Sequence, residues 1–418
     1  MCKQLFVGLL LALFFCFSSV SAQSGKNKTY LKKAIKCLNN NKYDETINLC
    51  NKVLATDSSL AITYYLKASA YFYQENYNEA GPTIIKAIQT DPSDGSYYNL
   101  LAATLYESGY LDDAETIYKK AINAGFETAE LYFNLGLLKY EKHEFKEATG
   151  YFHQALQLNP GWEEALIYRA NCKIKLGYPQ EAIEDFSKII KKNPKNLQAY
   201  FLRGSCYIEK GEFALAINDY TEILKYSKNN SDALDQRGVA RAYSGDLEGG
   251  LADLNKAIEL APEDSGPRNN RGLILGFIMK DYAAAIPDLD RAIELNPEMS
   301  ESYNNRGLMK AGLNQHTEAI IDYTKAIELD PSPAFPYNNR GLSKAMVKDF
   351  DGALKDINYS LSLQADNSYA YRNRAIVFIE MNLLDDACED LQFAKKLGFQ
   401  IRYGNEVNDL IKKHCSID

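Results

Sequence analysis

The chain has 418 residues with a net charge of −8 at pH 7, and 46% of its residues are apolar and 24% charged. This composition is typical of a folded protein and excludes a largely disordered chain. The acidic balance argues against nucleic-acid binding, because phosphates require a basic surface.

The first 22 residues have the pattern of a cleavable export signal. Lys3 precedes an apolar run over residues 5–17, and small residues follow up to Ala22, as a signal peptidase requires. The run is shorter than the roughly 20 residues that span a bilayer, so a retained anchor is the less favoured alternative. We therefore expect residues 1–22 to be removed and residues 23–26 to form a linker. The mature protein is expected to be periplasmic or extracellular, or to enter the secretory lumen in a eukaryote, with no membrane-spanning segment.

From Asn27 onward the sequence pattern repeats every 34 residues. Small residues recur at position 8 of each repeat, and Ala, Gly or Thr recurs at position 20. Small residues on two helical stretches let the helices approach closely, so each repeat is expected to be an antiparallel helix pair that turns near position 15. Proline near the end of most repeats prevents the second helix from continuing. The repeats start at residues 27, 61, 95, 129, 163, 197, 231, 265, 300, 334 and 368.

This pattern resembles the tetratricopeptide repeat (TPR) family. It has aromatic residues at positions 4 and 24 (Tyr98 and Phe152), Ala at positions 20 and 27, and proline at position 32 (Pro160). The resemblance implies an all-α, right-handed superhelical solenoid of antiparallel helix pairs over residues 27–399, with a concave groove. One helix pair cannot bury its apolar stripe alone, so neighbouring repeats must stack. Residues 400–418 are expected to form a C-terminal capping helix and tail.

The repeat that starts at residue 265 is irregular. It is longer than the others by one residue and has Pro287 at position 22, inside its second helix. Pro82 occupies the same position of the second repeat. Because proline removes a backbone donor, we expect both helices to bend and the curvature to differ in the longer repeat.

Arginine at position 7 and aspartate at position 23 occur together from the fifth repeat to the eleventh, and neither occurs in the first four. In a hairpin that turns at position 15 these positions lie opposite each other, so we expect a charge-assisted pair within each repeat. A row of arginines that binds an anionic ligand is the less favoured alternative, because each arginine has its own carboxylate. The expected structural ion pairs are Arg169 with Asp185, Arg203 with Asp219, Arg237 with Asp253, Arg271 with Asp288, Arg306 with Asp322, Arg340 with Asp356, and Arg374 with Asp390.

Asparagine recurs at positions 5 and 6. An amide donates and accepts at once, so it can bind a peptide backbone without reading its side chains. The family resemblance implies that position 6 tends to face the groove, where the TPR superhelix of O-linked N-acetylglucosamine transferases has an asparagine ladder that grips peptide backbone. The alternative is a set of solvated or locally bonded amides. The candidate peptide-binding residues are Asn134, Asn269, Asn270, Asn304, Asn305, Asn338, Asn339 and Asn373.

The remaining chemistry-bearing residues give no catalytic or metal-binding pattern. No glycine-rich phosphate loop, nucleophile elbow or histidine cluster is present, so we expect no enzyme activity, no metal and no cofactor. Cys172 and Cys206 occupy equivalent points of adjacent repeats, roughly 10 Å apart, which is too far for a disulfide. The candidate disulfides are Cys37 with Cys50 and Cys388 with Cys415.

These observations predict an exported, non-enzymatic scaffold that binds protein or peptide partners in the concave groove of a TPR superhelix. One alternative is a regulatory or targeting subunit of an envelope or glycan-modifying enzyme complex. Another is a spacer with no specificity on its concave face. The pattern indicates no nucleic-acid partner and no particular oligomeric state.

Overall fold

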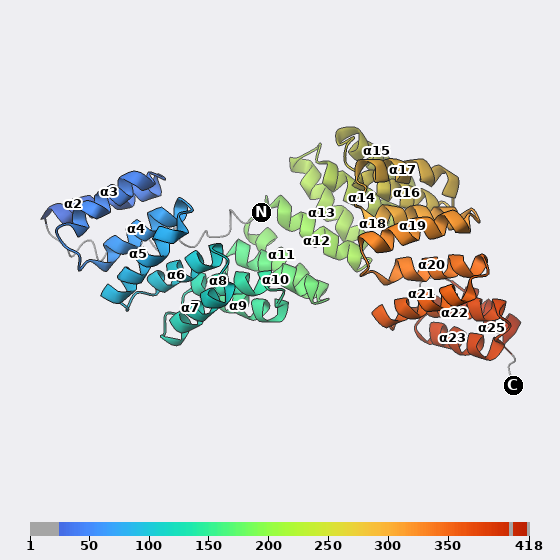
Figure 1. The fold of residues 1–418 in the computed structure, drawn as a ribbon. Helices are drawn as coiled ribbons and strands as arrows, with labels where there is room; N and C mark the ends of the chain where they lie inside the picture. Colours follow the sequence, from blue (N-terminus) through green and yellow to red (C-terminus); the bar gives the residue numbers. More distant parts are fainter. Residues whose placement is uncertain (1–24, 401–403, 416–418) are drawn as a thin grey trace. The chain divides into compact units, whose positions relative to one another are not determined.

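The computed structural model describes residues 25–400 and 404–415, which fold into helices without any strand (Figure 1). The chain divides into two compact units, unit 1 (Met1–Lys210) and unit 2 (Gly211–Asp418). No helix in the described part is both long and apolar enough to cross a membrane. The predicted signal peptide and the first two linker residues lie outside the described residues.

Unit 1 contains five helix pairs and one further helix in its described part, and consecutive helices are joined by short turns. The pairs are α2 (Gly25–Asn39) with α3 (Tyr43–Leu54), α4 (Ala61–Tyr73) with α5 (Tyr77–Thr90), α6 (Gly95–Glu107) with α7 (Leu111–Asn123), α8 (Ala129–Glu141) with α9 (Phe145–Leu158), and α10 (Glu163–Lys175) with α11 (Pro179–Lys192). The further helix is α12 (Leu197–Glu209).

Unit 2 begins with α13 (Phe213–Tyr226) and continues with five helix pairs within its described residues. The pairs are α14 (Ser231–Ser244) with α15 (Leu247–Leu260), α16 (Gly266–Leu273) and η3 (Ile274–Ile278) with α17 (Tyr282–Leu295), α18 (Ser300–Gly312) with α19 (His316–Leu329), α20 (Ala334–Met346) with α21 (Phe350–Leu363), and α22 (Ser368–Glu380) with α23 (Leu384–Lys396). A final helix, α25 (Glu406–His414), packs against α23.

Within each unit the helix pairs stack in chain order, and every helix contacts the next one. The first helices of neighbouring repeats also contact one another, as α4 with α6 in unit 1 and α18 with α20 in unit 2. These first helices therefore lie side by side and together form one face of each unit. The residues on that face determine what the unit presents to a ligand.

The turn between the two helices of a repeat is marked by one residue with a positive φ, between 56° and 99°. A left-handed residue at this place ends a helix by satisfying its last carbonyl groups, and glycine adopts it without steric cost. Where another residue stands there, the cost is roughly 1–2 kcal/mol. The left-handed residues are Asn41, Glu75, Gly109, His143, Gly177, Gly211, Gly245, Lys280, Asn314, Lys348 and Asn382.

The small residue at position 8 lets the two helices of a repeat approach closely. A Cβ added at Gly307 would lie 2.8 Å from the ring of Tyr323, and one added at Gly341 would lie 2.6 Å from Ile357. Tyr323 is 1% exposed, so its ring has no room to move away. The glycine of the sequence "YNNRGL" therefore serves packing between the two helices.

The extra residue of the eighth repeat is accommodated by η3, a π-helical turn. A π turn holds one more residue than an α turn, and such turns often occur at functional sites. A Cβ at Gly276 would overlap the sulfur of Met309, so η3 lies close against α18. The next residue, Phe277, projects outward and is 45% exposed. Helix α17, the second helix of this repeat, continues through Pro287, as α5 does through Pro82.

Only one of the two candidate disulfides is formed. Cys388 of α23 and Cys415, directly after α25, are bonded, with their Cα atoms 5.7 Å apart. The bond holds the C-terminal helix to the last repeat. Burial raises the pKa of the Cys50 thiol to about 12. The free, buried thiols are Cys37, Cys50, Cys172 and Cys206.

Candidate peptide-binding groove

Arginine and aspartate join the two helices of a repeat. Arg169 donates from Nε and Nη2 to the Asp185 carboxylate at 2.8 and 2.6 Å, and the Asp185 side chain is fully buried. Burial raises the pKa of Asp185, but hydrogen bonds from Arg169 and Lys173 outweigh it and hold that pKa below its usual value. The same two-bond arrangement occurs in Arg237 with Asp253, Arg271 with Asp288, Arg306 with Asp322, Arg340 with Asp356, and Arg374 with Asp390.

The predicted pair of Arg203 and Asp219 has one member in each unit. This pair therefore stays a prediction. Within unit 1, Arg203 donates from Nη1 to the hydroxyl of Ser187 at 2.9 Å.

Each of these arginines also contacts the preceding repeat, which the sequence pattern did not predict. Arg306 Nη1 donates to Asp290 at 2.7 Å, and Arg374 Nη1 donates to Asn358 at 2.6 Å. A guanidinium with its donors in a rigid fork can bridge two acceptors, so it fixes neighbouring repeats relative to each other. The hydrogen-bond partner lies on the second helix of the preceding repeat and is polar in every case. The partners are His153, Ser187, Thr221, Asn255, Asp290, Thr324 and Asn358.

The asparagines form a second set of bonds between repeats. Asn305 Nδ2 donates to Asn269 Oδ1 at 3.0 Å, and Asn373 Nδ2 donates to Asn338 Oδ1 at 3.1 Å. In each case the amide at position 6 donates to the residue at position 5 of the preceding repeat. The other bonds of this ladder are Asn134 to Asn99, Asn270 to Asp235, and Asn339 to Asn304.

The predicted peptide contact of these asparagines stays a prediction. Positions 5 and 6 lie where neighbouring first helices meet, and a buried amide there needs a partner, which the adjacent repeat supplies. Asn270, Asn304 and Asn339 are partly exposed and can still contact a ligand. The five that are at most 8% exposed are Asn134, Asn269, Asn305, Asn338 and Asn373.

One bond of the ladder uses a carboxylate in place of an amide acceptor. Asp235 accepts from Asn270 at 2.9 Å and from Gln236 at 3.0 Å, and it is 7% exposed. Burial raises the pKa of Asp235 to about 6, because the two hydrogen bonds offset only part of the desolvation cost. A carboxyl group whose pKa is raised by folding stabilises the fold at low pH. This stabilisation is lost as the pH rises from about 4 through about 6.

Asp235→Asn should therefore raise the free energy of unfolding by about 2 kcal/mol near pH 7.5 and change it little near pH 4. The asparagine keeps an acceptor for Asn270 and has no charge to desolvate. Urea unfolding at the two pH values measures the effect. Glu248→Gln, an exposed change on the paired helix α15, is the control and should have no such pH dependence. An equal gain at both pH values would contradict the assignment of the shift to Asp235.

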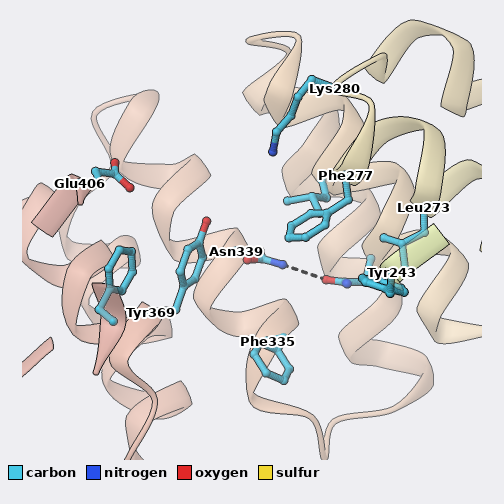
Figure 2. Close-up of a pocket in the computed structure, with 11 residues that line it drawn as sticks. Tyr243, Leu273, Phe277, Lys280, Phe335, Asn339, Tyr369 and Glu406 are labelled. Atoms are coloured by element: carbon cyan, nitrogen blue, oxygen red, sulfur yellow. Dashed lines mark hydrogen bonds between the residues drawn. The ribbon is translucent and has the colours of Figure 1, made fainter. Parts of the chain in front are cut away.

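A groove runs along the first helices of unit 2 and is lined by aromatic side chains (Figure 2). It consists of two overlapping cavities of about 560 and 700 Å³, which fall in the range of ligand sites. We call this space the unit 2 groove and define it by the residues that line both cavities: Phe277, Lys280, Leu308, Asn339 and Tyr369.

Three aromatic side chains in the lining are exposed to solvent. Tyr243 of α14 is 39% exposed, Phe277 of η3 45% and Phe335 of α20 50%. Figure 2 shows Phe277 and Tyr369 on either side of Asn339. Single exposed apolar residues are ordinary, but several in one concave surface indicate a binding site. Helix α25 contributes Glu406, Leu410 and Lys413 to the lining.

The aromatic lining was not among the predicted site residues. The sequence contains a signal for it, since apolar residues recur at positions 2, 9 and 13 of the first helices: Phe335 and Tyr369, Leu273 and Leu308, Tyr243 and Phe277. These positions share one helical face that the pairing of the two helices does not use. The described residues hold no cluster of His, Cys, Asp or Glu placed to bind a metal ion.

Comparison with known proteins gives consistent matches to one repeat family. Tetratricopeptide repeat models match residues 65–130, 129–162, 169–233, 268–299 and 300–333, which together make up more than half of the chain. A comparison with curated proteins gives no significant match.

Solved structures of repeat proteins match over much of the chain. A tetratricopeptide repeat protein from Parabacteroides merdae is 19% identical, with 69% of this chain and 99% of that chain covered and a TM-score of 0.50. Yeast Tom70 is 16% identical, with 93% and 95% covered and a TM-score of 0.50. The C-terminal part of a TPR repeat-containing protein from Cytophaga hutchinsonii is 17% identical, with 57% and 98% covered and a TM-score of 0.50. At these identities the likeness shows the fold alone. The chain belongs to the tetratricopeptide repeat family.

Proposed function

We propose that the protein is a scaffold that binds protein or peptide partners through the unit 2 groove. The observation that carries the proposal is the set of exposed aromatic side chains in the unit 2 groove. Tyr243, Phe277 and Phe335 line a single cavity there. Large rigid aromatic groups give most binding energy per residue at protein interfaces. Partly exposed amides of Asn304 and Asn339 line the same cavity and can hydrogen-bond a peptide backbone.

The proposal assigns no catalytic role to the recurring polar residues. The arginine, aspartate and asparagine residues of the repeats bond to one another, either within a repeat or between repeats. Their recurrence is explained by this stacking. The function proposed for the chain is therefore binding rather than chemistry.

The proposal also includes export of the mature protein. Its support is the signal-like pattern of residues 1–22 and the Cys388–Cys415 disulfide, since such bonds persist in oxidising compartments. Sequencing the N-terminus of protein from its native cells tests this point. Gln23 as the first residue supports export, and Met1 contradicts it.

The groove is tested with peptides selected from a random display library on the full chain. The double variant Phe277→Ala, Phe335→Ala should bind the selected peptides at least about tenfold more weakly, because it removes two exposed aromatic contacts. Binding is measured by fluorescence anisotropy.

The matched control removes two exposed apolar side chains from second helices. Ile321 of α19 is 65% exposed and Leu363 of α21 is 42% exposed. Ile321→Ala with Leu363→Ala should leave the affinity unchanged. If the groove variant and the control bind the peptides equally well, the groove is not the binding site.

A further inference from the structure

The carboxylates that line the unit 2 groove already have cationic partners. Glu406 pairs with Arg372, and Glu380 lies 2.7 Å from the Lys348 ammonium. This pairing occurs in an acidic part of the chain, because residues 211–418 contain 23 basic and 33 acidic side chains. A cation of the groove that has no carboxylate partner therefore gives the groove a local positive charge within an acidic unit.

Two lysines of the groove are in this position. Lys280 and Lys413 line the same cavity of about 700 Å³ and are exposed. Within the described part of the chain, neither has a carboxylate at ion-pair distance. His316 adds no charge near neutral pH, because burial lowers its pKa. The net charge offered to a ligand in this cavity is positive.

Lys280 lies close to the aromatic side chain of Phe277 at the groove. Lys280 has a φ of 60° and lies in the turn between η3 and α17, two residues after the end of η3. Its ammonium lies 5.1 Å from the centre of the Phe277 ring, and Figure 2 shows both side chains on the same wall. A carboxylate that reaches Lys280 therefore brings neighbouring ligand atoms against an aromatic ring.

Apolar side chains line the same cavity as the two lysines. Leu308, Leu342, Met346 and Ile379 line the cavity that contains Lys280 and Lys413. Such a surface favours a ligand that has apolar groups and negative charge close together. Many ligands could bury apolar area here, and the positive charge of the lysines favours the acidic ones among them.

We propose that the unit 2 groove binds peptide segments in which large apolar or aromatic side chains alternate with aspartate or glutamate. This inference rests on the proposed function and specifies the chemistry of the partner. The apolar side chains occupy the space beside Phe277 and Leu308, and the carboxylates pair with Lys280 and Lys413. Asn304 and Asn339 remain available to the peptide backbone.

The test uses three labelled peptides of equal length that share the same Phe and Leu positions. The intervening residues are glutamate in the first, glutamine in the second and lysine in the third. Binding to the full chain is measured by fluorescence anisotropy at low and high salt. The glutamate peptide should bind at least about tenfold tighter than the lysine peptide, and added salt should reduce the difference.

A charge-reversal variant identifies the lysines responsible. Lys280→Glu with Lys413→Glu should abolish or reverse the preference for the glutamate peptide. The matched control is Lys256→Glu with Lys325→Glu, on second helices, where both side chains are 46% exposed. This control should keep the preference.

The outcomes separate this inference from the proposed function. Equal binding of the three peptides, combined with loss of binding in the Phe277→Ala, Phe335→Ala variant, retains the groove and overturns the charge preference. A preference that survives the reversal of Lys280 and Lys413 also overturns the inference. Failure of all three peptides to bind at millimolar concentration overturns it as well. Binding that the aromatic variant leaves intact removes the groove itself.

Discussion

Arg374→Ala should lower the free energy of unfolding by about 3 kcal/mol, roughly twice the effect of Arg340→Ala. Asp390 is 4% exposed, and Arg374 is the one cation at ion-pair distance from it among the described residues. Asp356 is 5% exposed, but the Lys344 ammonium lies 2.9 Å from its carboxylate and remains when Arg340 is removed. A buried carboxylate left without a cation is costly, so the two variants should differ.

The two arginines are otherwise closely matched. Arg340 and Arg374 stand at the same position of adjacent repeats, and each also donates to the preceding repeat, to Thr324 and Asn358 respectively. Because stability in repeat arrays is partly local, urea unfolding is combined with hydrogen exchange of the last two repeats. Adding Asp390→Asn to Arg374→Ala should recover part of the loss, since it removes the buried charge. Equal losses in the two single variants would contradict the role of Lys344.

Loss of the Cys388–Cys415 disulfide should release α25 from the last repeat. The bond closes a loop across a sequence separation of 27 residues, for which the chain-entropy relation gives about 3.5 kcal/mol. Two side chains of α25 are buried, Val407 and Ile411, and they pack in the cluster that contains Phe399. A helix of nine residues is marginal without tertiary contacts, so α25 depends on this bond.

Hydrogen exchange of residues 406–414 measures the release. Protection there should fall by more than about a hundredfold in Cys388→Ser with Cys415→Ser, and helices α14–α21 should remain protected. Dithiothreitol should reproduce the result in the wild type, because Cys37, Cys50, Cys172 and Cys206 are free thiols already. Unchanged protection of α25 would show that its apolar contacts suffice.

The contacts within a repeat could be predicted from the sequence because they depend on a short hairpin. The turn near position 15 places positions 7 and 23 opposite each other, and Arg306 with Asp322 follows from that arithmetic alone. The small residue at position 8, such as Gly307, likewise predicts close approach of the second helix. Fold class follows from the same local geometry repeated along the chain.

The contacts between repeats could not be predicted in the same way. They depend on the angle at which one helix pair packs on the next, and the 34-residue period does not specify that angle. The bond from Asn305 to Asn269 and the bond from Arg306 to Asp290 both cross between repeats. For this reason the asparagines were predicted to contact a ligand, and their bonds between repeats were not predicted. No prediction included Phe277 or Phe335.

The π turn η3 shows how such a protein can acquire a new binding surface. Arg271 and Asp288 are 17 residues apart, whereas the other pairs in the described residues are 16 apart, yet the two bonds between them are the same. The insertion therefore alters the helix face that carries Phe277 and leaves the Arg271–Asp288 pair between the two helices unchanged. Ligand preference and architecture can consequently evolve independently in this chain. Insertions and substitutions on the face formed by the first helices can change the ligand preference without changing how the repeats pack.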